Sequence, residues 1–249
     1  MRSRTVFPSL AVAAVLTAST GSAFATLLTG NLAVNGAGAV GVSSDGTSYV
    51  IDFQEPVNID GNGTGGVNIV GGSTGAFAAL IGTQATLRDL NSTAVPVGAA
   101  VNYTDFLTFS APAASQWTIT LTKLLPGVFT ATNCFSAPAA GQTCTVGLPG
   151  VSDFNWANTS SHSSTVSATF EGLATDKATG ETTQVLGTLG ATFSDRSYQQ
   201  VLAAAVAGST ITTSYSGTIT AVPEPATTSM MLLGGLLAAG AMVTRRMRS

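Results

Sequence analysis

Apolar and polar residues alternate along several stretches of the chain, which is the pattern of a β-strand with one buried and one solvent-facing side. The alternation is clearest over residues 116–124, where Trp117, Ile119 and Leu121 are separated by threonines. Pro126 then gives a turn signal. Further strands are predicted over residues 32–34, 39–42, 49–53, 67–70, 85–90, 101–109, 128–132, 164–173, 182–193 and 210–221.

The stretch 101–109 does not alternate cleanly, because Phe106 falls on the opposite parity to Leu107 and Phe109. This indicates a strand that is covered on both sides or is broken by a bulge. The residues from 176 to 180 are polar and form a predicted hairpin loop between the strands on either side.

One segment has helical rather than alternating spacing. Ser194 or Asp195 is the predicted N-cap, and Gly208 follows the last turn. The apolar stripe of this helix consists of Tyr198, Val201, Leu202 and Ala205. The pattern predicts an all-β fold, specifically an antiparallel β-sandwich over residues 26–221 with one packed short helix.

The N-terminus has the three parts of a secretory signal peptide. Arg2 and Arg4 supply a basic region, and an apolar run covers residues 6–16. Ala23 and Ala25 flank Phe24 in an A-x-A cleavage site. We therefore expect residues 1–25 to be a signal peptide that is cleaved after Ala25.

The C-terminus, residues 222–249, is equally distinctive. Residues 226–244 contain no charge and are just long enough, as a helix, to cross a hydrocarbon core of about 30 Å. Arginines at positions 245, 246 and 248 follow, and the positive-inside tendency keeps them cytoplasmic. Pro223 and Pro225 flank Glu224 and favour an extended backbone before this span.

This tail resembles the PEP-CTERM sorting signal. The matching parts are Val222-Pro223-Glu224-Pro225, the apolar span and the terminal arginines, including Arg245 and Arg246. The resemblance implies export by a Gram-negative bacterium, transient anchoring through a transmembrane helix, and processing by the membrane protease-transpeptidase exosortase. The alternative is an ordinary C-terminal anchor that happens to follow a Pro-Glu-Pro triplet.

The charge of the chain narrows the classes of partner. Only 8% of residues are charged, and the formal net charge is −3. Five of the arginines lie in the two terminal signals. The part between the signals has four basic and eleven acidic residues, so its net charge is about −7 and it is more acidic than the whole chain. An acidic surface without a basic patch argues against nucleic acid as a partner.

Cys134 and Cys144 are the only cysteines, and both lie in the part expected to be exported. An oxidising compartment makes a disulfide the expected state. The chain lacks a Cys-x-x-Cys motif and has His162 as its only histidine, so we expect neither a metal site nor a cofactor. The Gly-rich turn at 60–66 has part of a calcium-loop pattern but lacks the glutamate at its twelfth position, and we interpret it as a hairpin turn.

Three classes of function remain. The first is a non-enzymatic cell-surface or extracellular-matrix protein with a structural or adhesive role in the exopolysaccharide or biofilm matrix. The second is a carbohydrate-binding module for the cell's own exopolysaccharide, with Trp156 as the candidate exposed stacking residue. The third is a secreted hydrolase that uses His162, in a polar loop, or a carboxylate pair such as Glu171 and Glu181. We expect the first, with no catalytic residues.

Overall fold

A computed structural model of the protein describes residues 28–36, 40–44, 49–53, 64–91, 94–109, 117–145, 154–209 and 211–222. The described part is mainly strand, with two short 3₁₀ helices, Gly75–Leu80 and Ala131–Asn133, and one α-helix, α1 (Tyr198–Val206). The strands are β1 (Asn31–Gly36), β2 (Val40–Ser44), β3 (Tyr49–Phe53), β4 (Thr64–Ile69), β5 (Gln84–Arg88), β6 (Leu90–Asn91), β7 (Ala100–Phe109), β8 (Trp117–Leu125), β9 (Thr143–Thr145), β10 (Asn155–Ser160), β11 (Ser163–Asp176), β12 (Thr182–Phe193), β13 (Ile211–Thr213) and β14 (Tyr215–Ala221).

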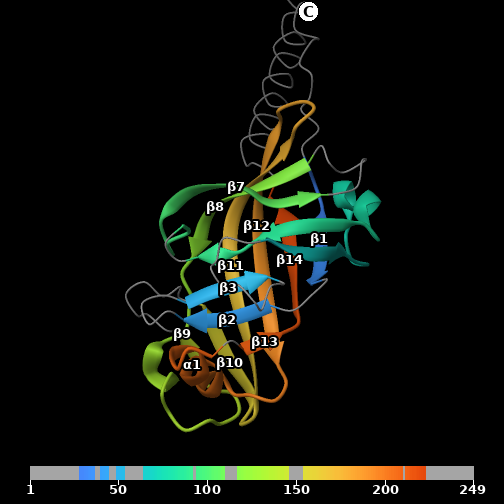
Figure 1. Ribbon diagram of the computed structural model, residues 1–249. Coiled ribbons are helices and arrows are strands. Elements are labelled where there is room, and N and C mark those ends of the chain that lie inside the picture. Colours follow the sequence, from blue (N-terminus) through green and yellow to red (C-terminus); the bar gives the residue numbers. More distant parts are fainter. Residues whose placement is uncertain are drawn as a thin grey trace, which may run out of the picture.

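Eight of these strands close into an antiparallel ring (Figure 1). Their order is β12, β14, β1, β4, β5, β7, β8 and β11, and β11 pairs with β12 again. The predicted all-β antiparallel class is thus confirmed, but the predicted sandwich is replaced by a closed barrel. The reason is that β12 is hydrogen-bonded on both sides, to β11 and to β14, so the ring has no free edge there.

Strand β11 is long enough to pair with two different strands along the same edge. Its second half, from Thr169 to Asp176, pairs with β8 and belongs to the barrel. Its first half, from Ser163 to Ser167, pairs with β10, which in turn pairs with β9. The long β11–β12 hairpin therefore extends beyond the barrel and carries a second region of the molecule at its far end.

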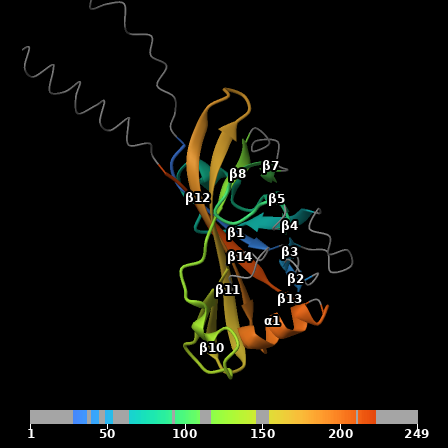
Figure 2. The ribbon, with the colours of Figure 1, turned by 90° about the vertical axis from the view of Figure 1, so that its left-hand side faces the viewer.

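A smaller antiparallel sheet, in the order β13, β2, β3, β6, lies beside the barrel. Helix α1 contacts β2 and β13 of this sheet as well as β10 and β11. Figure 2 shows α1 and this sheet on one side of the long β11–β12 hairpin. Sequence alternation alone does not reveal that the strands belong to two sheets.

The two long strands have the expected alternation. In β11, Val166, Ala168 and Phe170 are buried, as predicted. Gly187 of β12 lies directly across from Phe170, and a Cβ added at Gly187 would collide with the phenyl ring. The phenyl ring thus takes the space that a side chain on the neighbouring strand would otherwise fill.

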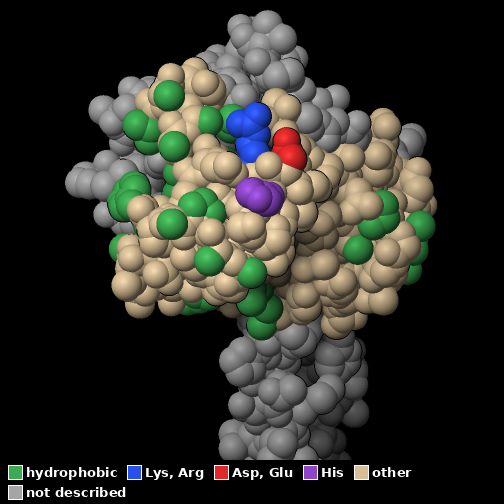
Figure 3. Space-filling view, turned by 90° about the horizontal axis from the view of Figure 1, so that it is seen from below, with side chains coloured by type: hydrophobic (Ala, Val, Ile, Leu, Met, Phe, Trp, Pro, Cys, Tyr) green, Lys and Arg blue, Asp and Glu red, His purple; other side chains and the backbone are tan. Residues whose placement is uncertain are grey.

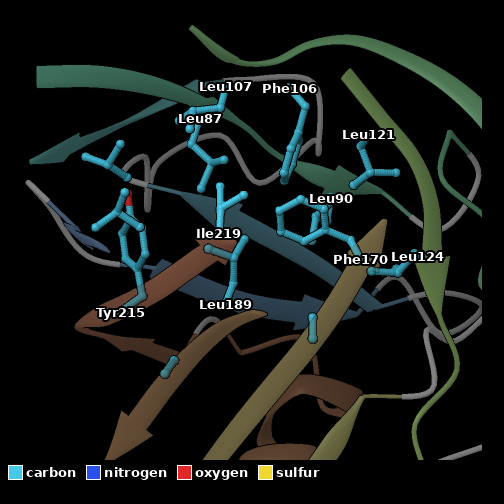
Figure 4. Packing of buried hydrophobic residues seen from close by; sticks show 14 of the residues in the cluster. Leu87, Leu90, Phe106, Leu107, Leu121, Leu124, Phe170, Leu189, Tyr215 and Ile219 are labelled. Carbon is cyan, nitrogen blue, oxygen red and sulfur yellow. The ribbon is translucent and has the colours of Figure 1, made fainter. Parts of the chain in front are cut away.

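The barrel core gathers around that ring. Phe106 from β7 meets Phe170 edge-on, with centroids 5.0 Å apart and ring planes at 76°. Leu121 and Ile219, also buried, come from β8 and β14 and lie near the same ring in Figure 4. Strands far apart in the sequence therefore share one apolar interior.

The bulge considered for residues 101–109 is present. The β7–β8 register shifts twice, and Asp105 has a left-handed φ of +52°. This turn of the backbone allows the successive residues Phe106 and Leu107 both to be buried. The Thr118 hydroxyl donates to Asp105 Oδ1 at 3.0 Å and holds the bulge against β8.

Helix α1 starts slightly later than predicted. Ser197, rather than Ser194 or Asp195, is the N-cap: its hydroxyl accepts the Gln200 N–H, and Gln200 Oε1 accepts the Ser197 N–H at 2.9 Å. This is a capping box. The predicted apolar stripe is buried, and Gly208 follows the helix with a φ of +78°.

One predicted strand is wrong and another is divided in two. The expected strand at 128–132 is absent: Val128 N–H donates to the Asn155 side chain and Phe129 N–H to the Thr145 hydroxyl, after which the chain forms a 3₁₀ turn into Cys134. The expected single strand at 210–221 is divided at Ser214, because β13 joins the small sheet and β14 joins the barrel.

Among the described residues, no helix has the length and hydropathy needed to cross a membrane. The predicted signal peptide at 1–25 and the predicted transmembrane helix both lie outside the described residues.

Candidate functional site

The molecule has two distinct ends along the β11–β12 hairpin. The last described residue, Val222, lies beside Gln184, near the start of β12. The disulfide, α1 and the β10–β11 turn lie toward the other end, near Phe193, where β12 finishes. The nine residue-to-residue steps from Gln184 to Phe193 correspond to about 30 Å of strand.

At the first end, both termini of the described domain converge on β12. Val222 N–H donates to Gln184 O at 2.8 Å, and Leu28 N–H donates to the Thr183 hydroxyl at 3.3 Å. A hollow of about 460 Å³ lies beside Val222 and is lined in part by Leu186 and Glu171. We call this region the tail-exit end.

Of the predicted sorting and cleavage residues, only Val222 is described, and its side chain is 39% exposed. The other predicted residues of the two terminal signals lie outside the described residues: Ala23, Ala25, Pro223, Glu224, Pro225, Arg245 and Arg246. Their roles remain predictions.

At the second end, the predicted disulfide between Cys134 and Cys144 is confirmed. Both cysteines are buried, and they close a short loop that carries no charged residue. Cys144 in β9 lies opposite Trp156 in β10. We call the loop 126–145, together with β10 and α1, the disulfide end.

A buried asparagine connects the loop to the helix. Asn158 is 3% exposed, and its amide nitrogen donates to Gln199 Oε1 at 2.9 Å and to Ala139 O at 3.2 Å. Its carbonyl oxygen accepts the Tyr198 N–H at 2.9 Å. Gln142 completes the network by accepting from Gln199 Nε2 at 2.7 Å. A satisfied buried network of this kind fixes the relative positions of its elements.

The prediction that Trp156 is an exposed stacking residue is wrong. Trp156 is 3% exposed and stacks on Phe193 with centroids 6.1 Å apart. The reason is its parity in β10, which places Trp156 and Asn158 on the inner face, beneath the disulfide and α1. Trp156 is therefore a core residue of the disulfide end.

His162 lies in the turn between β10 and β11 and is exposed, as expected for a loop histidine. Its backbone N–H donates to the Ser160 hydroxyl at 3.1 Å, and Ser160 and Ser163 share a hydrogen bond of 2.7 Å. Figure 3 views this end and shows one basic and one acidic side chain close to the histidine, on a surface that is otherwise uncharged.

The remaining polar cluster braces the barrel. The Arg88 guanidinium lies 4.0 Å from the centroid of the Tyr103 ring, and Tyr103 donates its hydroxyl to Asp89 O at 3.0 Å. Tyr215 donates its hydroxyl to Gly66 O at 2.8 Å. Burial raises the pKa of Tyr103 and raises that of Tyr215 more strongly. The negative charge of Asp89 raises the pKa of both phenols further. The phenols are thus kept neutral as hydrogen-bond donors.

The carboxylates proposed for hydrolysis are exposed or half-exposed: Glu171 faces outward beside Lys123 on β8, and Glu181 lies just before β12. Within the described ranges, no group of three or more His, Cys, Asp or Glu side chains is placed to hold a metal ion. The turn at 60–66 is described only from Thr64, where β4 begins.

Comparison with known proteins adds no relative: no family model, no curated protein and no solved structure matches this chain. The assignment of function therefore depends on the residues themselves. The feature that the sequence interpretation missed is Phe135, which is 82% exposed on the disulfide loop. A signal that could have found it is a phenylalanine directly after a cysteine in a charge-free segment.

Proposed function

We propose that this chain is an exported, non-enzymatic protein of the cell surface or extracellular matrix, delivered by its PEP-CTERM-like tail and adhesive or structural in its role. The observation that carries the proposal is the direct passage from the last barrel strand into the tail. β14 ends at Ala221, and Val222 is still hydrogen-bonded to β12. The Pro223-Glu224-Pro225 triplet follows at once in the sequence.

The disulfide supports this proposal because disulfides persist in oxidising compartments and are rare in the bacterial cytosol. Only 8% of the residues are charged, and binding of nucleic acid needs a cluster of basic residues. This composition therefore favours a matrix role over nucleic-acid binding. Carbohydrate binding through Trp156 is excluded by its burial and is not part of the proposal.

The tail is tested by replacing Pro223, Glu224 and Pro225 with alanine in the full chain. The expected result is accumulation of an unprocessed form in the inner membrane and loss of the protein from the surface fraction. Lys177→Ala, in the exposed hairpin loop next to the tail-exit end, is the matched control and should leave processing unchanged. Normal processing and delivery of the triple variant would refute the proposal.

A further inference from the structure

Phe135 presents its ring to solvent from a stretch of backbone that is held on both sides. Single exposed hydrophobic residues are common on protein surfaces, so its 82% exposure alone means little. What distinguishes this ring is its backbone, because Cys134 on one side is held by the disulfide and Ser136 on the other is held by hydrogen bonds.

Those hydrogen bonds converge on one carbonyl. Asn133 O accepts the Tyr198 hydroxyl at 2.9 Å, the Ser136 hydroxyl at 2.9 Å and Gln199 Nε2 at 3.4 Å. The Ser136 hydroxyl in turn accepts Gln142 Nε2 at 3.1 Å. The loop is therefore tied to α1 on both sides of Phe135. A loop whose backbone is already held in place loses little backbone conformational entropy when its exposed side chain binds a partner.

The surroundings of the ring define the chemistry of that partner. The whole loop from 126 to 145 lacks charged residues, so it offers nothing to attract a polyanion or a polycation. Its exposed groups are hydroxyls such as those of Thr130 and Thr132, and the apolar side chains of Val128 and Phe129. A loop that carries both an exposed aromatic ring and neutral hydroxyl groups suits a ligand that has both apolar faces and hydroxyls.

We propose that the disulfide loop binds a neutral polysaccharide and that Phe135 is its stacking residue. A pyranose ring offers a face of C–H groups to the phenyl ring and hydroxyls to the threonines. This inference rests on the proposed matrix location, which brings the protein to such polymers. The loop lies at the opposite end of β12 from Val222, so binding at the loop leaves the tail accessible.

The test is native affinity electrophoresis of the full chain in non-ionic detergent, through gels containing galactomannan or hydroxyethyl cellulose as neutral probes, or alginate as a polyanion. The expected result is retardation by a neutral probe and none by alginate. Phe135→Tyr, which keeps the ring, should retain binding. Phe135→Leu, which keeps apolar character without the ring, should weaken binding about fivefold, or about 1 kcal/mol.

Val206→Ala on α1 is the matched control, because Val206 is also an exposed apolar residue, at 60%. It should bind as the original chain does. The proposal is overturned by absence of retardation in both neutral gels, by retardation only in alginate, or by equal binding of the Leu and Tyr variants. A dimer that forms without polysaccharide and is lost in Phe135→Leu would also overturn it, in favour of self-association.

The result is separable from the fate of the sorting proposal. The gel assay needs no export, so its failure leaves delivery by the tail intact. Conversely, the sorting proposal alone fails if the triple alanine variant of the tail is processed and delivered normally and is still retarded in the gel.

Discussion

The two ends of this protein are held together in different ways. The tail-exit end belongs to a closed barrel whose apolar side chains come from strands at both extremes of the domain, such as Leu32 in β1 and Ile219 in β14. The disulfide end relies instead on a covalent bond and on the Asn158–Gln199–Gln142 network. The first is organised by packing, and the second by specific links.

This difference corresponds to the proposed division of work. A barrel that pairs the first strand with the last delivers both chain ends to one place, where a tail can be processed. A loop that is fixed by specific links rather than by a large core can leave an aromatic ring in solvent on a backbone that is held in place. The following predictions, from the largest expected effect to the smallest, test whether the two ends are indeed independent.

The largest effect is expected from Gly187→Val in the barrel. A Cβ at this position collides with the Phe170 ring, and Phe170 is fully buried. We expect the free energy of unfolding to fall by about 3–4 kcal/mol, measured by urea denaturation. Gly190→Ala on the same strand is the control, because its Cβ meets only Val166 O, at 3.3 Å. Equal stability of the two variants would show that the ring is easily displaced.

An intermediate effect is expected from the double variant Cys134→Ser/Cys144→Ser. Opening this short loop should cost about 2–3 kcal/mol, or roughly 5–10 °C in melting temperature for a domain of this size. Hydrogen exchange then separates the two ends. Faster exchange at the Tyr198 amide, with an unchanged Ile219 amide, would confirm independence. Equal acceleration at both amides would mean that the two ends unfold as one unit.

The smallest effect concerns alkaline pH. Burial raises the pKa of Tyr215 above its unfolded value of about 10, so the neutral phenol is favoured in the folded state. This contribution is fully present below about pH 10 and is lost as the pH rises further. Tyr215→Phe should cost about 1 kcal/mol at pH 8, from the lost bond to Gly66, and should flatten the decline in stability between pH 8 and 11.

Tyr198 provides the comparison at the other end, because burial raises its pKa as well. If the disulfide end opens separately, Tyr198→Phe should leave the pH dependence of global unfolding nearly unchanged. An effect as large as that of Tyr215→Phe would contradict the independence of the two ends.

The local elements were largely predictable from the sequence because their signals are local. The β11–β12 hairpin follows from alternation around a polar loop, and α1 follows from its apolar stripe and Gly208. The disulfide followed from there being only two cysteines in a chain expected to be exported. Each of these depends on residues close together in the sequence or on a simple count.

The closure of the ring was not predictable in the same way. The alternation of residues in β12 does not indicate that this strand pairs with both β11 and β14, because the pairing of strands depends on the whole sheet. Trp156 was misjudged for a related reason: the nearby Asn155 and Asn158 suggested an exposed position, whereas pairing with β9 and β11 places Trp156 on the inner face. Phe135 was missed because exposure of an apolar residue depends on the loop that presents it.

The position of β14 between β12 and β1 has a consequence for the synthesis of the chain. The barrel lacks one strand until the last residues of the domain have been synthesised. A chain that stops before Ile211 leaves the edges of β12 and β1 that face β14 unpaired. Such fragments are expected to aggregate or to be degraded. Only a chain that has been translated through its final strand can therefore close the barrel.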